Sequence, residues 1–299
     1  MTTTKHIAVI GLGSMGYGIA KSLLRAGHQV YGYDLNQEQV QKVINEGGHN
    51  GNDTVDSKSL DAAVVVVLSS TQMETVLFGP KGIVHNMKTG SVVVACTTVS
   101  PAFAKEMEAK CKAVNVHYLD APISGGSIKA VDGNLSIMAA GTPAAFTAAR
   151  PVLGATADTI FELGDEAGAG SAMKAVNQLL AGVHIAAMAE ALTFGMTQGI
   201  EPKQFLEVIS KCAGTSWMLE NRAPHITKGD YTPHSAIDIW PKDLGIVLEI
   251  AESVNFRAPI AAAALQRFTE ASSSGLGSED DAAVAKIYAD EVNLKLPGQ

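Results

Sequence analysis

The sequence predicts an α/β protein with an N-terminal, Rossmann-type doubly wound sheet and an all-α C-terminal domain. Three observations support this fold class. Short apolar runs rich in β-branched residues alternate with helical patterns over the first half, as expected for parallel strands covered by helices on both faces. A glycine-rich turn, Gly11–Gly16, joins the first such strand to the first helix. After about Phe161 the strand patterns stop and alanine-rich helical patterns follow.

A glycine-rich joint over residues 164–170 divides these two patterns, so we expect domains of residues 1–165 and 166–299. The expected strands are short and apolar, and they cover residues 6–10, 29–33, 63–68, 91–95, 117–120 and 136–140. The helices expected between them cover residues 14–26, 37–46, 71–78 and 101–112. In the second half the clearest helical patterns cover residues 172–198, 202–210, 241–253 and 260–273.

Composition limits the class of partner. The 299-residue chain has a formal charge of −8 and no basic tract, so nucleic acid and anionic membranes are poor partners. Polar residues interrupt the longest apolar stretch, residues 179–196, which favours a buried helix over a membrane span. The apolar helices of the second half exceed the needs of one core, which suggests a homodimer or homotetramer.

Cysteine and histidine residues give no sign of a disulfide framework or a metal site. The cysteines are odd in number and show no C-x-x-C spacing: Cys96, Cys111 and Cys212. This pattern fits a reducing compartment, and we expect a cytoplasmic protein. The candidate histidine ligands lack metal-ligand spacing with acidic partners and are interpreted as core or surface residues: His184, His225 and His234.

The glycine-rich turn predicts a dinucleotide site. Gly11 would allow the tight turn, Gly13 would let the backbone approach a pyrophosphate, and Gly16 would permit close packing of helix on strand. The helix N-terminus adds free N–H groups for the phosphates. An ordinary tight turn is the alternative, but a strand precedes this turn and a helix follows it. The predicted contacts are the whole turn: Gly11, Leu12, Gly13, Ser14, Met15 and Gly16.

Asp34 at the end of the second expected strand predicts which dinucleotide binds. Its carboxylate can accept hydrogen bonds from the ribose hydroxyls and would repel a 2′-phosphate. Leu35 and Asn36 follow it, so no arginine is present to hold such a phosphate. We therefore expect the cofactor to be NAD and not NADP.

The loop Asp120–Gly126 follows the apolar run that ends at Leu119. Its Ser124-Gly125-Gly126 turn presents consecutive backbone N–H groups without bulky side chains, which could bind a carboxylate. A purely structural loop would have the same composition, so this pattern alone leaves both interpretations open.

Lys174 lies in a long helix that is otherwise almost wholly apolar. Ser171 is the predicted N-cap of that helix, and Lys174, Asn177 and Gln178 share one face by their spacing. The lysine must either extend to water along the helix surface or line a polar cleft, where partial burial would lower its pKa and suit it to proton transfer. Position alone does not decide between these two roles.

Together these motifs resemble those of the β-hydroxyacid dehydrogenases, and the resemblance covers essentially the whole chain. In this family a G-x-G-x-x-x-K segment carries the catalytic lysine, which corresponds to Lys174. The resemblance implies that Ser124, Gly125 and Gly126 bind the substrate carboxylate. It also implies that Lys174 transfers the proton of the reacting hydroxyl while NAD accepts the hydride.

The resemblance suggests further contacts. The segment from Thr97 to Pro101 is similar to a family turn on the nicotinamide side, which assigns Thr98 to the cofactor, although an N-cap role for Thr98 is compatible with the pattern. Leu68-Ser69 stands where many members have leucine-proline beside the cofactor. The lysine of a K-D pair, Lys242, would reach both the substrate and the cofactor. Many members have asparagine four residues after the lysine, so either Asn177 or Gln178 would contact the substrate.

Within the family, segments 72–79, 178–184 and 221–233 look most like those of members that oxidise a four-carbon sugar acid, L-threonate, at C2. Reduction of tartronate semialdehyde and oxidation of 3-hydroxyisobutyrate are the alternative reactions. A non-catalytic NAD sensor or scaffold is an alternative of another class, but the retained Lys174 argues against it.

Overall fold

The computed structural model describes residues 3–54 and 59–298. The chain forms two compact units, Met1–Lys174 and Ala175–Gln299. Helix α8 (Ala169–Thr197) runs from the first unit into the second, so the observed division falls inside a helix. The boundary expected from the sequence, between residues 165 and 166, precedes that helix.

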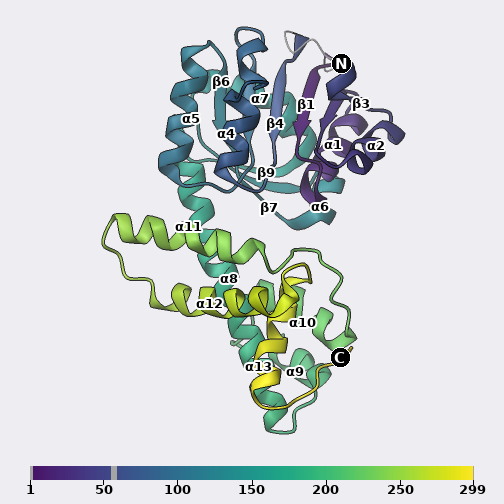
Figure 1. Ribbon diagram of the computed structural model, residues 1–299, viewed down its shortest axis with the longest axis vertical. Coiled ribbons are helices and arrows are strands. Elements are labelled where there is room, and N and C mark those ends of the chain that lie inside the picture. Colours follow the sequence, from purple (N-terminus) through teal and green to yellow (C-terminus); the bar gives the residue numbers. More distant parts are fainter. Residues whose placement is uncertain (1–2, 55–58, 299) are drawn as a thin grey trace. The chain divides into compact units, whose positions relative to one another are not determined.

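The first unit contains a six-stranded, all-parallel sheet in the order β3-β2-β1-β4-β5-β6 (Figure 1). The order reverses between β1 and β4, which pair along Ile7–Ile10 and Ala62–Val65. In such sheets ligands bind outside the carboxyl ends of the strands at this reversal. The strands are β1 (His6–Ile10), β2 (Gln29–Tyr33), β3 (His49–Asn50), β4 (Ala62–Val65), β5 (Val92–Ala95) and β6 (His117–Asp120).

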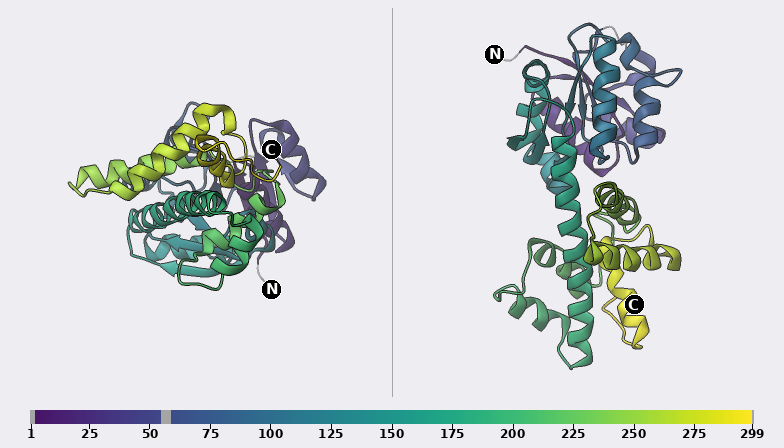
Figure 2. Two further views of the ribbon diagram at one scale, coloured as in Figure 1. Left: turned by 90° about the horizontal axis from the view of Figure 1, so that it is seen from below. Right: turned by 90° about the vertical axis from the view of Figure 1, so that its left-hand side faces the viewer.

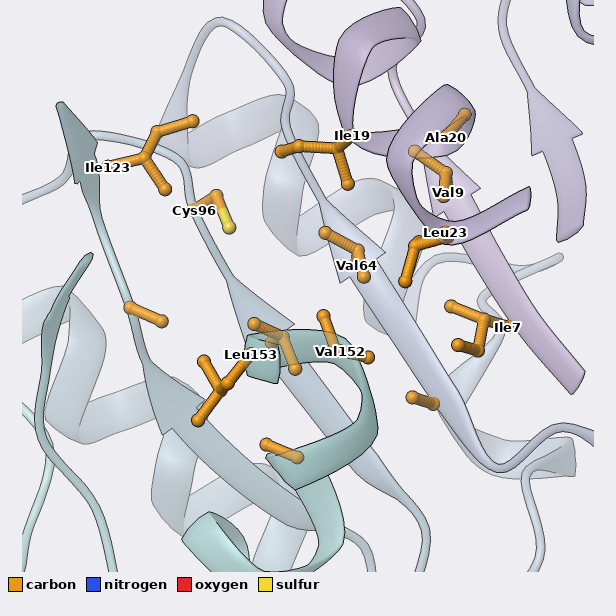
Figure 3. Close-up of a cluster of buried hydrophobic side chains, with 14 of the residues drawn as sticks. Ile7, Val9, Ile19, Ala20, Leu23, Val64, Cys96, Ile123, Val152 and Leu153 are labelled. Atoms are coloured by element: carbon orange, nitrogen blue, oxygen red, sulfur yellow. The ribbon is translucent and has the colours of Figure 1, made fainter. Parts of the chain in front are cut away.

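Alternate residues of β1 pack on opposite faces of this sheet. Ile7 and Val9 belong to a core formed with α1 and α7, and Figure 3 shows Ile19 and Leu23 of α1 in that core. Ala8 and Ile10 belong to a second core formed with α4 and α5. The helices of the first unit are α1 (Ser14–Arg25), α2 (Gln37–Asn45), α3 (Gly51–Thr54), α4 (Ser70–Phe78), α5 (Pro101–Ala113), α6 (Gly126–Asp132) and α7 (Pro143–Thr156).

A second, three-stranded sheet has the order β7-β8-β9. Its strands are β7 (Ile123–Ser124), β8 (Leu135–Ala139) and β9 (Ala157–Glu162), with β7 antiparallel and β9 parallel to β8. The sequence predicted only the middle strand, at residues 136–140, and suggested no separate sheet. Helices α6 and α7 were also not predicted.

The second unit is helical and packs around the part of α8 that it contains (Figure 2). Ile185, Met188 and Leu192 of α8 are fully or almost fully buried in its core. The following helices are α9 (Pro202–Ile209), α10 (Trp217–Lys228), α11 (Ile239–Ser253), α12 (Pro259–Ala271) and α13 (Ala285–Glu291). The clearest sequence patterns anticipated α8, α9, α11 and α12, whereas α10 and α13 were not among them.

Helix α8 is long and apolar enough to cross a membrane by length and composition alone, with a mean hydropathy of 1.5 over an 18-residue window. However, 44% of that window is buried inside the protein. A core helix has the same length and composition, so this property is weak evidence for a membrane span.

A buried carboxylate fixes the start of α11. Asp281 is fully buried, and it accepts hydrogen bonds from Arg222 Nε of α10 at 2.5 Å and from Trp240 Nε1 of α11 at 3.0 Å. Burial raises the pKa of this carboxyl, although the Arg222 guanidinium opposes the rise. Because a buried charge without a partner is strongly unfavourable, Arg222 should be essential to this unit.

We therefore expect Arg222→Met to lower the free energy of unfolding by about 3–5 kcal/mol, because it leaves the buried Asp281 carboxylate without its cation. The matched variant Arg267→Met removes an arginine whose partners Glu270 and Glu291 are substantially exposed, and it should lower stability by about 1 kcal/mol or less. Denaturant unfolding followed by circular dichroism measures both values. Equal losses in the two variants would contradict the argument.

Candidate active site

The turn after β1 requires glycine at two positions. Gly11 has φ +88°, and a Cβ there would lie 2.3 Å from the backbone oxygen of Val66. A Cβ on Gly16 would lie 1.8 Å from the oxygen of Gly11, so α1 packs directly against the turn. These two contacts explain the first and third glycines of the motif.

Gly13 has a different environment. A Cβ built there meets no atom within 4 Å, so the backbone faces open space at this position. Gly13 is also the N-cap of α1, and no side chain caps the helix. The first N–H groups of α1 are therefore available to an anion, which fits the pyrophosphate of a dinucleotide.

Asp34 follows β2 and is tied to the same turn. Its Oδ2 accepts a hydrogen bond from the Leu12 N–H at 2.6 Å, and its Oδ1 accepts one from the Asn36 N–H at 2.8 Å. Each carboxylate oxygen has a second lone pair, so the group can still accept hydroxyl donors. The carboxylate is fixed beside the glycine-rich turn, as a ribose-binding residue requires.

The other predicted cofactor contacts of the first unit lie in loops that follow β4 and β5, at the same edge of the parallel sheet. Leu68 is 66% exposed, and Ser69 is the N-cap of α4, where its Oγ accepts from the Gln72 N–H at 3.2 Å. Thr98 is half-buried. The alternative N-cap role for Thr98 is wrong, because Ser100 caps α5.

Asp120, the last residue of β6, anchors the start of α8. Its Oδ2 accepts from the Gly168 N–H at 2.9 Å and from the Ser171 N–H at 2.8 Å, and its Oδ1 accepts from Ser171 Oγ at 2.7 Å. The N-cap prediction for Ser171 is wrong: α8 begins at Ala169, and the distant carboxylate binds its free N–H groups. Burial raises the pKa of the Asp120 carboxyl, and the hydrogen bonds from Ser171 and Gly168 oppose that rise.

Lys174 lies just beyond this anchor. Its side chain is not extended to water, because the residue is 9% exposed and its Nζ donates to the Ile123 backbone oxygen at 2.9 Å. Ile123 belongs to β7 and is followed directly by Ser124. The structure therefore brings Lys174 to the segment that begins the predicted carboxylate cradle.

That cradle has a backbone that strongly favours glycine. Gly125 has φ +133° and Gly126 has φ +80°, and α6 begins at Gly126. Ser124 is half-buried, and Gly126 is exposed. A Cβ on Gly126 would meet no atom within 4 Å, so a small ligand has room at this backbone.

Four polar side chains form a connected set in the second unit. Gln178 Nε2 donates to Asp243 Oδ2 at 2.5 Å, and Asn177 Nδ2 donates to Gln178 Oε1 at 2.9 Å. Lys242 Nζ lies 2.6 Å from Asp243 Oδ1. This last contact is an ion pair whose angles do not satisfy a hydrogen bond. The set contains all three predicted substrate contacts of this unit.

Comparison with known proteins identifies the family of the chain. A family model described as the NAD binding domain of 6-phosphogluconate dehydrogenase matches residues 6–164. A second, described as the NAD-binding domain of NADP-dependent 3-hydroxyisobutyrate dehydrogenase, matches residues 168–288. The chain belongs to the NAD-binding hydroxyacid dehydrogenase family. It therefore binds NAD, the cofactor that the sequence predicted.

Members of this family match nearly the whole chain. An L-threonate dehydrogenase of Cupriavidus necator is 45% identical over 99% of this chain and 99% of its own length. An L-threonate dehydrogenase of Escherichia coli is 43% identical over 98% of this chain and 97% of its own. A solved structure described as 3-hydroxyisobutyrate dehydrogenase from Salmonella typhimurium is 46% identical, with a TM-score of 0.89 over 95% of this chain and 99% of its own.

Sequence reasoning missed the anchoring role of Asp120 and the link between Gln178 and Asp243. The apolar sequence context of the two aspartates was the one signal that could have indicated these roles. Asp120 ends an apolar strand and Asp243 lies among apolar helix positions, and both patterns indicate a buried side chain. A buried carboxylate must have hydrogen-bond donors, but the sequence does not reveal which donors they are.

Two of the three glycines of the turn, Gly11 and Gly13, give a matched pair of tests. Gly11→Ala should lower the free energy of unfolding by about 2–4 kcal/mol, because it combines a positive φ with a backbone clash. Gly13→Ala should leave stability unchanged within about 0.5 kcal/mol but weaken NADH binding by roughly tenfold or more, because its methyl group occupies the space that the pyrophosphate needs. Thermal unfolding and NADH fluorescence titration measure these effects. Unimpaired NADH binding by Gly13→Ala would refute the assignment of this turn.

Proposed function

We propose that this enzyme uses NAD to oxidise L-threonate at C2, giving 2-oxo-tetronate. The observation that carries the reaction is the buried Lys174, held on the Ile123 backbone oxygen next to Ser124. The choice of substrate is supported by the nearly full-length relatives named L-threonate dehydrogenase. These two supports are independent, because the first concerns the reaction and the second concerns the molecule that undergoes it.

In this proposal the substrate carboxylate binds Ser124, Gly125 and Gly126. The backbone N–H groups and the Ser124 hydroxyl supply donors for its two oxygens. Such binding would place the C2 hydroxyl, which is adjacent to the carboxylate, beside the segment that holds Lys174. Because Ile123 and Ser124 are adjacent, one short segment can both hold Lys174 and bind the substrate carboxylate.

Lys174 acts as the general base for the C2 hydroxyl. A neutral amine can donate one N–H to the Ile123 oxygen while its lone pair accepts the substrate proton. Bound NAD supplies the acceptor for the hydride that leaves C2. The alcohol thus loses one proton to the lysine and one hydride to the cofactor, and becomes a ketone. In the reverse direction the Lys174 ammonium returns the proton to the forming alkoxide.

We assign the cofactor contacts by the part of NAD that each would bind. The turn Gly11–Gly16, including Leu12, Ser14 and Met15, binds the pyrophosphate, and Asp34 binds the adenosine ribose and disfavours a 2′-phosphate. The nicotinamide side is assigned to Leu68, Ser69, Thr98 and Lys242 on the family resemblance. Lys242 and one of the two neighbouring amides, Asn177 or Gln178, are assigned to the substrate on the same basis.

We also propose that the enzyme is a cytoplasmic homodimer or homotetramer without nucleic acid or membrane partners. The three cysteines are free, which fits a reducing compartment. One face of α8 exposes Val176, Leu180 and Phe194 to 56%, 49% and 66%, a helical apolar stripe suited to a second copy. Light scattering should give a multiple of 31.1 kDa, and Leu180→Glu should reduce that mass. A monomeric wild-type protein at micromolar concentration would contradict this assignment.

A second candidate substrate is 3-hydroxyisobutyrate. The solved structure at 46% identity is described as a dehydrogenase of that acid, whereas curated relatives of similar identity are named for L-threonate. The two acids differ in ways that an assay can separate. L-threonate is oxidised next to its carboxylate and carries further hydroxyls, whereas 3-hydroxyisobutyrate is oxidised one carbon further away and carries a methyl group.

A panel of hydroxy acids assayed with NAD and NADP tests the proposal. We expect kcat/KM to be highest for L-threonate with NAD, with at least a tenfold preference over 3-hydroxyisobutyrate, because one or two polar contacts of about 1–3 kcal/mol each distinguish these acids. Tartronate semialdehyde with NADH should be included as a reductive substrate. Turnover of 3-hydroxyisobutyrate without turnover of L-threonate would show that the proposed substrate is wrong.

Lys174→Ala provides the control for the mechanism. Loss of a general base typically lowers kcat by about 10²–10⁴-fold, whereas NADH binding should be preserved, because the predicted pyrophosphate and ribose contacts are unchanged. NADH fluorescence titration verifies binding, and Lys129→Ala offers a matched variant at an exposed lysine near the cradle. A variant Lys174→Ala that keeps full turnover would exclude the lysine as the base.

A further inference from the structure

The four connected polar side chains of the second unit come from two helices and differ in burial. Asn177 and Gln178 are neighbours on α8, and Lys242 and Asp243 are neighbours on α11. Asp243 is 2% exposed and Gln178 is 7% exposed, whereas Asn177 is half-buried. The hydrogen bonds therefore link the buried carboxylate of Asp243 to the amide of Gln178, and that amide to the more exposed amide of Asn177.

The carboxylate determines the direction of every donor in this order. Asp243 forms an ion pair with Lys242 at 2.6 Å, and an ionised carboxylate can only accept hydrogen bonds. Gln178 must therefore turn its amide N–H₂ toward Asp243, where Nε2 lies 2.5 Å from Oδ2. Its carbonyl oxygen then faces Asn177, which donates through Nδ2 at 2.9 Å.

The consequence falls on Asn177. Because its amide nitrogen is turned toward Gln178, its carbonyl oxygen is turned away from Gln178. An asparagine by itself could present either end of its amide, since the two ends have nearly the same shape. Here the buried Asp243 carboxylate, which is two hydrogen bonds away, determines which end of the Asn177 amide faces Gln178.

We propose that Asp243 and Gln178 are positioning residues that hold the Asn177 carbonyl ready to accept a hydrogen bond from a substrate hydroxyl. This inference rests on the proposed function, in which the substrate is a polyhydroxy acid. It chooses between the two amides: Asn177 touches the substrate, and Gln178 sets the direction in which Asn177 faces. The preferred ligand is a hydroxy acid with a second hydroxyl that donates to Asn177.

This arrangement discriminates between substrates of similar size. A second hydroxyl satisfies the Asn177 oxygen, whereas a methyl or methylene group at that place removes the oxygen from water without replacing the lost hydrogen bond. Sites built to bind a substrate hydroxyl can reject an analogue without it by several powers of ten. Substitution of Gln178 or Asp243 should therefore lower kcat/KM for a substrate with the second hydroxyl more than kcat/KM for an analogue without it.

The test compares L-threonate with 2-hydroxybutanoate of the same C2 configuration, which lacks the hydroxyls at C3 and C4. We expect the wild-type enzyme to prefer L-threonate by about 10²-fold or more in kcat/KM. Gln178→Met is similar in volume and releases Asn177 from its orientation. It should lower kcat/KM for L-threonate by roughly 10–100-fold, as expected for loss of one oriented hydrogen bond, and that for 2-hydroxybutanoate by less than about threefold.

Gln178→Glu supplies the second variant, which tests whether another hydrogen-bond acceptor at this position restores the preference. A glutamate oxygen still accepts from Asn177, but two carboxylates at this separation must share a proton. At a pH low enough to keep that proton, we expect this variant to retain the preference for L-threonate that Gln178→Met loses, because its other oxygen accepts from Asn177. Because the readout is the ratio between two substrates, any titration of Lys174 affects both and cancels.

The outcomes separate the alternatives. Proportional losses with both substrates in Gln178→Met would mean a merely structural role and would overturn the proposal, as would an unchanged preference. Loss of the preference in Gln178→Glu at low pH would also overturn it. NADH binding and thermal unfolding verify that each variant is folded. A wild-type enzyme that does not oxidise L-threonate refutes the proposed function instead, and the positioning role is then decided by the same ratio for the best polyhydroxy acid of the panel and its deoxy analogue.

Discussion

The candidate active site depends first on the carboxylate of Asp120. It ends the edge strand β6 and accepts three hydrogen bonds, one from Gly168 just before α8 and two from Ser171 in its first turn. Hydrogen bonds to a charged group contribute about 1.5–3 kcal/mol each, which offsets the unfavourable burial that raises the pKa of this carboxyl. Without these bonds the first turn of α8 would expose unpaired N–H groups in a buried place. The position of Lys174, one turn further along, follows from this anchor.

The same short loop then serves a second purpose. Three residues after Asp120, the backbone oxygen of Ile123 accepts the Lys174 hydrogen bond, and the next residues form the Ser124–Gly126 cradle. A rotation of α8 about its axis would therefore break the Asp120 contacts and the Ile123 contact together. The lysine is placed by the fold of one loop, and its own flexible side chain contributes little to that placement.

The sequence predicted the parts of this site whose chemistry is local. The glycine-rich turn, Asp34 and the bounds of β1, β2 and β6 could be read from residue types, because steric and periodic constraints act within a few positions. Strands β7 and β9 were missed because β7 has only two residues and β9 is a largely exposed edge strand. The residue type of Ser171 predicts an N-cap, but a carboxylate 51 residues away performs the capping.

Long-range polar partners are the part that residue types do not reveal. The oxygen that holds Lys174 belongs to the backbone, so any residue at position 123 would supply it and no sequence pattern marks it. Gln178 illustrates the converse case. At a position where asparagine is common in the family, the longer side chain reaches Asp243 and leaves the neighbouring Asn177 as the more exposed amide. The side chain that is buried against the carboxylate and the side chain that remains partly exposed are therefore adjacent in the sequence, and only their hydrogen-bond partners distinguish them.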